Sequence, residues 1–401
     1  MKVLLVTSGS RGDVQPFIAL AKGLLGAGHE AVVAAPRRFE PLGNAAGVRL
    51  IGLDDSVFDL QDELAGAGVR AALGATRRAR PYLRRWLDDL VQLVDLRPDV
   101  VVFTQKTLGG AAVAERCGVP AVPAQLIPLA PPTRAFAMPL APAWTPQVLN
   151  RASWLTAAAV EAPWRSMVAA WRSERLGLPA RGQSFDQLAR RHGILSGWSR
   201  HLLPAPPDWP EDAAPTGFWT LPGRPGPIPE TVERFLAEGD PPVLVGFGSM
   251  PSRDPAGLTA PVVAGLRAAG RRGLLVSGTA GLGAGLAADD MCVVEQVPHQ
   301  AVLPRVAVAV HHGGVGTVAA ALCAGVPQVV HPFFGDQPFW ARRLRVLGVA
   351  PEPLDVLAAN RVADAVTAAA GLRPAAASMS ALLLAEDGIA AAIGRLERVA
   401  G

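Results

Sequence analysis

Short, uninterrupted apolar runs alternate along the chain with segments of helical periodicity. Val3 to Val6 is such a run, as expected for a parallel strand that is buried on both faces. The apolar positions that follow share one face of a helix; they are Phe17, Leu20, Ala21, Leu24 and Leu25. A second strand is predicted at 31–35, and further strands are predicted at 100–103 and 121–122. A strand, a helix and a strand at this spacing predict a parallel sheet with helices packed on it.

The same alternation resumes in the second half of the chain. Buried strands are predicted at 243–247, 274–276, 292–294 and 306–310, and a helix at 318–324. Between the halves, residues 203–229 contain nine prolines, a density that interior helices and strands do not tolerate. We therefore predict an α/β protein with two doubly wound, Rossmann-like domains facing a cleft. The predicted parts are a first domain over 1–205, a linker over 206–229, a second domain over 230–377 and a C-terminal helix over 378–401 that packs back on the first domain.

Composition excludes several classes of protein. The 401 residues are 50% hydrophobic and 18% charged, so the chain can build large cores and is not intrinsically disordered. Its three cysteines are far apart and form neither a disulfide framework nor a metal motif. The net charge is +4, and the arginine-rich clusters at 77–85 and 342–345 lack the interleaved aromatic residues of a nucleic-acid platform. We expect no nucleic-acid partner and no bound metal.

The opening stretch, MKVLLVTSGSRGD, has the pattern of a buried strand and a polar loop rather than of a secretory leader. The apolar runs are all shorter than the roughly 18 residues that a membrane helix needs. We expect a cytoplasmic protein, monomeric or homodimeric, with at most a peripheral contact with membranes.

The most distinctive local feature is the sequence HHGGVGT at 311–317, between a predicted strand and a predicted helix. Glycines there let the backbone approach a ligand closely and turn successive N–H groups outward. The helix N-terminus adds partial positive charge, and together these features favour the binding of a diphosphate. A purely structural tight turn is the alternative. The spacing matches neither a Walker loop nor a dinucleotide fingerprint.

Two further polar loops follow predicted strands, where open α/β sheets bind their ligands. Asp336 and Gln337 come after the strand at 328–330, and a neighbouring carboxylate and amide suit the vicinal hydroxyls of a sugar; a helix N-cap is the alternative for Asp336. Asp13 is the only acid in the loop 8–13. It either caps the following helix or acts as a general base toward a ligand.

The region from about 130 to 200 is rich in tryptophan. Five of the nine tryptophans lie in it, namely Trp144, Trp154, Trp164, Trp171 and Trp198. Packing in a helical core explains any one of them. As a group they also fit the lining of an apolar ligand pocket.

Five segments carry a resemblance to a known family. They are GSRGDVQPFIAL (9–20), PAPPDWPEDAAPTGFW (204–219), GFGSMP (246–251), VPHQAVLPRVAVAVHHGGVGT (297–317) and PFFGDQPFWARRL (332–344). The chain resembles the family 1 glycosyltransferases of GT-B fold, and among them the sterol 3-β-glucosyltransferases and the vancomycin-type antibiotic glycosyltransferases. The resemblance implies that the first domain binds the acceptor and the second binds a nucleotide sugar.

The resemblance also implies roles for individual residues. Asp13 matches the position that activates the acceptor, and Trp144 and Trp154 are expected to contact the acceptor. The positions that match donor-binding residues are Ser10, Arg11, Ser249, Val297, His299, His311, His312, Gly313, Gly314, Gly316, Thr317, Asp336 and Gln337. The signature histidine of the family is either His311 or His312. Relatives with a histidine base pair it with a second aspartate, whereas here Asp99 stands only at the start of a strand, which favours a mechanism with Asp13 alone.

The implied reaction is an inverting, metal-independent transfer of a sugar, with UDP-glucose favoured as donor, to a hydroxyl of a lipophilic acceptor such as a sterol, polyketide or macrolide. No cofactor is expected besides the nucleotide sugar. Two alternatives remain: an antibiotic glycosyltransferase that uses a dTDP-deoxysugar, and a non-catalytic nucleotide-sugar-binding protein of the same fold. A sugar-nucleotide epimerase shares the scaffold, but the RGDV and FFGDQPFW segments fit it poorly.

Overall fold

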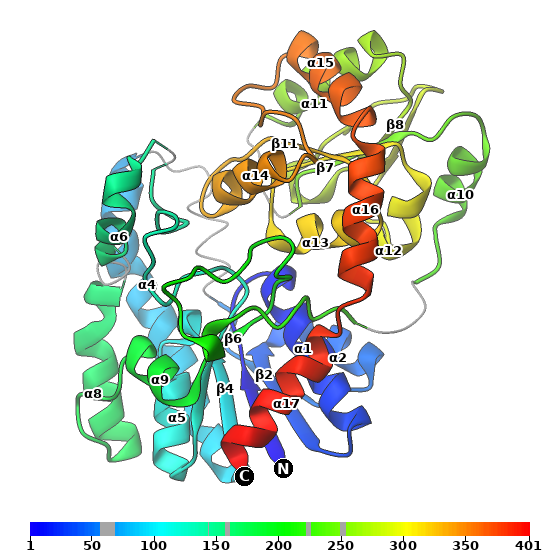
Figure 1. Ribbon diagram of the computed structural model, residues 1–401. Coiled ribbons are helices and arrows are strands. Elements are labelled where there is room, and N and C mark those ends of the chain that lie inside the picture. Colours follow the sequence, from blue (N-terminus) through cyan, green and yellow to red (C-terminus); the bar gives the residue numbers. More distant parts are fainter. Residues whose placement is uncertain (57–68, 143, 157–160, 222–225, 249–253) are drawn as a thin grey trace. The chain divides into compact units, whose positions relative to one another are not determined.

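The computed structural model of the chain describes residues 1–56, 69–142, 144–156, 161–221, 226–248 and 254–401, with the side chains of 69–76 excepted. The chain divides into two compact units, Met1–Pro222 with Asp387–Gly401, and Gly223–Glu386. Each unit is a parallel sheet with helices on both faces (Figure 1). The prediction of two doubly wound α/β domains is therefore confirmed.

The sheet of the first unit has six parallel strands. They are β1 (Lys2–Val6), β2 (Glu30–Pro36), β3 (Leu50–Leu53), β4 (Val100–Thr104), β5 (Ala121–Gln125) and β6 (Leu195–Ser196). Their order across the sheet is β3-β2-β1-β4-β5-β6. The chain thus builds outward from β1 in one direction and then returns to add β4 on its other side. Open α/β sheets bind ligands at such a reversal of strand order, outside the carboxyl ends of the two strands.

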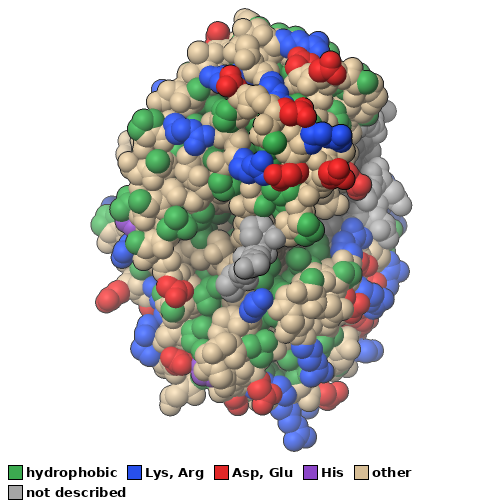
Figure 2. All heavy atoms as spheres, turned by 90° about the vertical axis from the view of Figure 1, so that its right-hand side faces the viewer, with side chains coloured by type: hydrophobic (Ala, Val, Ile, Leu, Met, Phe, Trp, Pro, Cys, Tyr) green, Lys and Arg blue, Asp and Glu red, His purple; other side chains and the backbone are tan. Residues whose placement is uncertain are grey.

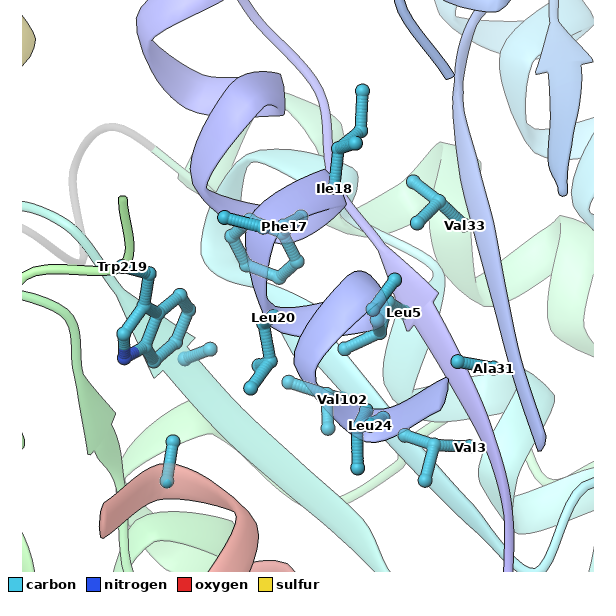
Figure 3. Packing of buried hydrophobic residues seen from close by; sticks show 14 of the residues in the cluster. Val3, Leu5, Phe17, Ile18, Leu20, Leu24, Ala31, Val33, Val102 and Trp219 are labelled. Carbon is cyan, nitrogen blue, oxygen red and sulfur yellow. The ribbon is translucent and has the colours of Figure 1, made fainter. Parts of the chain in front are cut away.

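The helices of the first unit cover both faces of this sheet. They are α1 (Arg11–Gly26), α2 (Glu40–Ala46), α4 (Val69–Leu90), α5 (Gly110–Cys117), α6 (Asn150–Ser153), α8 (Arg165–Leu176), α9 (Phe185–His192) and α17 (Gly388–Ala400). On one face, Phe17, Leu20 and Leu24 of α1 pack on β1, β2 and β4 (Figure 3). Leu25, which the periodicity also assigned to this buried face, is 40% exposed. It is the second-to-last residue of α1, which ends at Gly26.

The second unit repeats the design with five parallel strands and its own reversal point. The strands are β7 (Val243–Gly246), β8 (Gly273–Val276), β9 (Met291–Val294), β10 (Val308–His311) and β11 (Gln328–Val330), in the order β11-β10-β7-β8-β9. The helices are α10 (Glu230–Ala237), α11 (Pro255–Ala268), α12 (His299–Val302), α13 (Val315–Cys323), α14 (Gln337–Val346), α15 (Ala359–Ala370) and α16 (Arg373–Leu384). Here the strand order reverses between β7 and β10, so the loops after these two strands are the expected ligand site.

The proline-rich segment before the second unit packs on the first unit as far as residue 221. Trp209 and Trp219 are buried there, and the Thr216 N–H donates to the Ser196 carbonyl. Prolines prevent a helix, but aromatic side chains still anchor the segment. The domain boundaries expected at 205 and 229 stay a prediction.

Residues 373–400 are long and apolar enough for a membrane-spanning helix. They form two helices, α16 and α17, separated by residues 385–387. In α17, Ala392, Ile393 and Leu396 join the core beneath α1, and in α16 the Ser380 hydroxyl donates to the Cys323 carbonyl. Ala376 and Leu383 of α16 are also buried, whereas Leu382 and Leu384 are exposed.

Charges of both signs are interspersed on the face shown in Figure 2. Lysine and arginine side chains lie there among aspartate and glutamate side chains.

Candidate functional site

The reversal point of the first sheet brings Asp13 and Lys106 together. β1 and β4 are adjacent and parallel, with Val6 opposite Phe103. Asp13 lies in the first turn of α1 just after β1, and Lys106 lies in a short 3-10 turn (Gln105–Thr107) just after β4. The Lys106 Nζ and the Asp13 Oδ1 are 2.5 Å apart. The sequence did not single out Lys106, although it is one of only three lysines and follows a predicted strand.

The two oxygens of Asp13 have different partners. Oδ2 accepts hydrogen bonds from the backbone N–H of Ser10 at 2.8 Å and from the Ser10 hydroxyl at 3.1 Å. These contacts tie the carboxylate to the start of α1, as the capping interpretation predicts. Oδ1 points away from the cap toward Lys106. Asp13 can therefore cap the helix with one oxygen and act on a ligand with the other.

Ser10 and Arg11, both expected near the donor, lie at the start of α1. Ser10 is the N-cap residue of α1. Arg11 is exposed, and its Nε donates to the Gln15 side chain. Asp99 lies at the opposite end of the sheet, where it accepts the Lys2 N–H. The structure thus places Asp99 away from Asp13, as the sequence predicted.

A small cavity of about 30 Å³ opens beside Asp13. Apart from Asp13 and Lys106, its lining is uncharged: Thr104, Gln105, Ala124, Gln125, Leu126, Ile127, Leu129 and Phe185. This volume holds about one water molecule, or the hydroxyl end of a larger ligand.

A much larger hollow of about 870 Å³ lies nearby in the same unit. It is lined by Pro132, Arg134, Gln147, Val148, Arg151, Ala152, Trp154 and Leu155. Its size falls within the roughly 300–1,000 Å³ of small-molecule sites. Leu129 borders the small cavity and Pro132 the large one, and three residues span at most about 11 Å. The two hollows are therefore close together.

The tryptophans of this region lie in different environments: the core, the lining of the large hollow and the exposed surface. Trp171 and Trp198 are fully buried, as expected for core packing. Trp154 borders the large hollow, where its indole N–H donates to the Phe136 carbonyl. Trp144 is 79% exposed and does not line either hollow.

In the second unit, the structure separates the roles of the two adjacent histidines. His311 is the last residue of β10 and is buried. Its Nε2 donates to the Gln328 side chain at 2.8 Å, and its Nδ1 accepts the Gly313 N–H at 3.0 Å. Both ring nitrogens are therefore used within the fold, and His311 is a structural residue.

His312 is the histidine that is available to a ligand. Its Nδ1 is buried and has no hydrogen-bond partner in the described part of the chain, and such an atom calls for an explanation. Burial lowers the pKa of His312 to about 4, so the ring is neutral at physiological pH. A neutral ring can present one N–H donor to an anion.

Glycines make room for this imidazole and for the turn that follows it. Gly313 has φ +92° and a Cβ there would lie 2.8 Å from Val330 Cγ1, so only glycine fits. A Cβ on Gly314 would lie 2.4 Å from His312 Nε2, and one on Gly248, after β7, 2.9 Å from His312 Cε1. Gly314 is also the N-cap of α13, and Gly316 and Thr317 lie in its first turn. A half-buried imidazole and a helix N-terminus thus converge at the second reversal point.

The loop after β11 holds the predicted sugar-binding pair. Asp336 occupies the N-cap position of α14, but its Oδ2 accepts the Trp340 indole N–H at 2.8 Å instead of capping the helix. The Gln337 side-chain oxygen accepts the N–H groups of Phe333 and Phe334. The backbone carbonyl of Gln337 lies close to Gly313. The pair therefore lies beside the glycine turn, with its orientation fixed by these bonds.

Of the remaining donor-site candidates, His299 lies near the same turn, whereas Val297 belongs to the hydrophobic core of the second unit. Val297 is buried, and His299 opens α12 close enough to His312 to influence its pKa. Ser249 lies outside the described residues. Within the described part of the chain, no group of three His, Cys, Asp or Glu side chains is arranged to hold a metal ion.

Lowering the pH from about 6.5 toward 4 is expected to destabilise the second unit. An unfolded histidine takes up a proton near 6.5, whereas burial lowers the pKa of His311 to about 3 and that of His312 to about 4. In this window the unfolded state binds more protons. The free energy of unfolding therefore decreases as the pH is lowered, by up to about 1.4 kcal/mol per pH unit for each histidine. Above pH about 6.5 these histidines do not change the stability. Thermal denaturation should show a smaller loss between pH 7 and 4.5 for His311→Gln than for the wild type; equal losses would contradict the burial argument.

Comparisons with known proteins identify the class. The glycosyltransferase family 28 N-terminal domain matches residues 3–126, and the erythromycin biosynthesis protein CIII-like C-terminal domain matches residues 279–393. The O-mycaminosyltylonolide 6-deoxyallosyltransferase of Streptomyces fradiae is 35% identical over 96% of this chain and 93% of its own length. A sterol 3-beta-glucosyltransferase of Arabidopsis thaliana is 31% identical over 98% of this chain, which spans 64% of that protein.

Solved structures agree on the fold. The spinosyn forosaminyltransferase SpnP has a TM-score of 0.69 at 18% identity, covering 100% of this chain and 99% of its own. The glycosyltransferase VinC, solved in complex with DTDP, has a TM-score of 0.66 at 20% identity, with coverage of 100% and 99%. Two parallel-sheet α/β domains with these neighbours define the GT-B fold. The chain belongs to the family 1 glycosyltransferases of the sterol and natural-product type, which confirms the resemblance.

Proposed function

We propose that this protein is an inverting glycosyltransferase that moves a sugar from a nucleoside diphosphate sugar to a hydroxyl of a lipophilic acceptor. The observation that carries the proposal is a complementary pair of sites at the two reversal points. One offers a carboxylate beside a small, largely uncharged cavity and a large hollow, and the other a half-buried neutral imidazole at a helix N-terminus. A general base and an anion site are the two elements that transfer from a diphosphate requires.

The proposed reaction is a single displacement. The acceptor oxygen bonds to the sugar C1 while its proton passes to Asp13 Oδ1. The bond between C1 and the diphosphate oxygen breaks on the opposite face, and the electron pair leaves with the diphosphate, so the configuration at C1 inverts. His312 and the N–H groups at the start of α13 would stabilise the growing negative charge; one well-placed donor contributes about 3 kcal/mol. Asp336 and Gln337 would hold the sugar hydroxyls, and the scheme uses neither a metal nor a cofactor.

The acceptor is proposed to lie across the two hollows of the first unit. Its hydroxyl would enter the small cavity at Asp13, and its apolar body would rest against Trp154 and Leu155 in the large one. Leu155 is 77% and Val148 91% exposed. An apolar acceptor would remove this surface from water and gain about 25 cal/mol per Å². Trp144 lies outside both hollows, so its contact with the acceptor stays a prediction.

Two donor classes are candidates. UDP-glucose is favoured by the FFGDQPFW segment and fits the sterol glucosyltransferase relative. A dTDP-deoxysugar is the second candidate, favoured by the deoxyallosyltransferase relative and by the neighbour solved with DTDP.

Thermal-shift measurements with UDP, dTDP and GDP test the donor assignment. The nucleotide that matches the donor should raise the melting temperature, because a ligand at 100 times its Kd adds about 2.7 kcal/mol to the folded state. We expect UDP or dTDP to stabilise the protein and GDP to have no effect. The absence of stabilisation by all three would contradict the anion site at α13.

A further inference from the structure

Lys106 has no role in the proposed displacement, yet its ammonium lies against the carboxylate of Asp13, the proposed base. Its Nζ is 2.5 Å from Asp13 Oδ1, the oxygen that Ser10 leaves available. An ammonium held on this oxygen competes with any hydroxyl that would donate its proton there.

The backbone around Lys106 is firmly anchored. Thr107 is fully buried, and its hydroxyl donates to the Thr104 carbonyl at 2.7 Å. The Thr107 carbonyl in turn accepts the indole N–H of Trp86 at 2.9 Å. The Lys106 side chain is 45% exposed, against 17% for Asp13. A flexible side chain on a fixed backbone can leave the carboxylate and return without moving the sheet.

Other charges near the pair are engaged elsewhere. Arg11 is exposed and bonded to Gln15, and Glu161 accepts the Gln105 amide N–H. The other described residues that line the small cavity are uncharged. Lys106 is therefore the cation that acts on Asp13 Oδ1 from within this cavity.

We propose that Lys106 is a positioning residue: its ammonium keeps water from binding to Asp13 Oδ1, whereas an acceptor hydroxyl can displace it. This inference rests on the proposed function. The small cavity holds about one water molecule. A water molecule gains only its own hydrogen bonds when it displaces the ammonium. A lipophilic acceptor brings the binding energy of its apolar body, and binding energy from such remote parts can be used at the reacting centre.

The reaction that Lys106 suppresses is hydrolysis of the donor. In that reaction the water oxygen bonds to the sugar C1, a water proton passes to Asp13 Oδ1, and the diphosphate leaves with the electron pair of the broken bond. The products are the free sugar and the nucleoside diphosphate. Removal of Lys106 should therefore raise hydrolysis relative to transfer.

The test compares two rates in the full-length protein: UDP release from UDP-glucose without acceptor, and transfer to an acceptor alcohol. Lys106→Met and Lys106→Gln should raise the ratio of hydrolysis to transfer about tenfold, which corresponds to about 1.4 kcal/mol. Lys106→Arg should restore the wild-type ratio, because it keeps a cation at this place. Adding Asp13→Asn to Lys106→Met should abolish the extra hydrolysis. Lys22→Met, which removes the same charge from α1, should leave the ratio unchanged.

An unchanged ratio in both Lys106→Met and Lys106→Gln overturns the inference, as does extra hydrolysis that survives Asp13→Asn. A merely structural role would lower both rates together and leave the ratio constant. The failure of the proposed function looks different. In that case the wild type itself neither transfers nor hydrolyses UDP-glucose or its dTDP counterpart, and the inference falls with it.

Discussion

Asp13→Asn is expected to lower the rate of sugar transfer by a factor of about 10²–10⁴, the usual contribution of a general base. The amide keeps the shape of the carboxylate and can still accept the Ser10 hydrogen bonds that hold the start of α1. It cannot take up the acceptor proton. Donor affinity should be unchanged, since Asp13 belongs to the first unit and the anion site to the second. Steady-state transfer rates together with nucleotide titrations check both expectations.

Asp99→Asn is the matched control for this substitution. Asp99 lies in the same unit just before β4, and its side chain accepts the Lys2 N–H, a bond that an asparagine oxygen can also make. We expect wild-type transfer from this variant. Transfer by Asp13→Asn at the control rate would remove Asp13 from the mechanism.

The second large effect is expected from Gly314→Ala. The new Cβ would lie 2.4 Å from His312 Nε2, so the imidazole must leave its position beside the start of α13. The loss of one hydrogen bond to a charged group costs about 1.5–3 kcal/mol, so affinity for the nucleoside diphosphate should fall about 10- to 100-fold. Isothermal titration with UDP and dTDP measures this loss.

Two comparisons separate a local effect from a general one. Gly371→Ala is the matched control, because a Cβ there meets only a backbone oxygen at 3.4 Å, and its affinity should equal that of the wild type. His312→Ala should weaken binding in the same direction as Gly314→Ala. If Gly314→Ala and His312→Ala both bind the nucleotide as tightly as Gly371→Ala does, His312 is not part of the anion site.

The sequence predicts the elements well because burial on both faces leaves continuous apolar runs. The predicted strand at 243–247 and the strand β7 (Val243–Gly246) nearly coincide. The predicted helix at 318–324 begins three residues earlier in the structure, at Val315. The glycine-rich turn offered no apolar periodicity to mark that start.

The pairing of Asp13 with Lys106 could not be predicted in the same way. The two residues are 93 positions apart, and they meet only because β4 returns to the side of β1 after β2 and β3 have been added on the other side. Hydrophobic periodicity identifies strands but does not give their order. A systematic look at charged residues after each predicted strand would have selected Lys106.

Which of His311 and His312 is available to a ligand also could not be predicted from the sequence. Successive side chains at a strand end point in opposite directions, so one histidine joins the sheet and the other faces the loop. The sequence does not tell which is which. The partner of His311 is Gln328, on the neighbouring strand β11. Only the pairing of β10 with β11 brings that amide within reach.

The most direct test of the account is product analysis with the wild-type protein, UDP-glucose or a dTDP-deoxyhexose, and a panel of hydrophobic alcohols. Mass spectrometry should find an alcohol that carries one added sugar, together with an equal amount of released nucleoside diphosphate, and NMR of the glycoside should show an inverted anomeric centre. A protein that binds the nucleotide sugar tightly but glycosylates none of the alcohols, or a product that retains the anomeric configuration of the donor, would contradict the account.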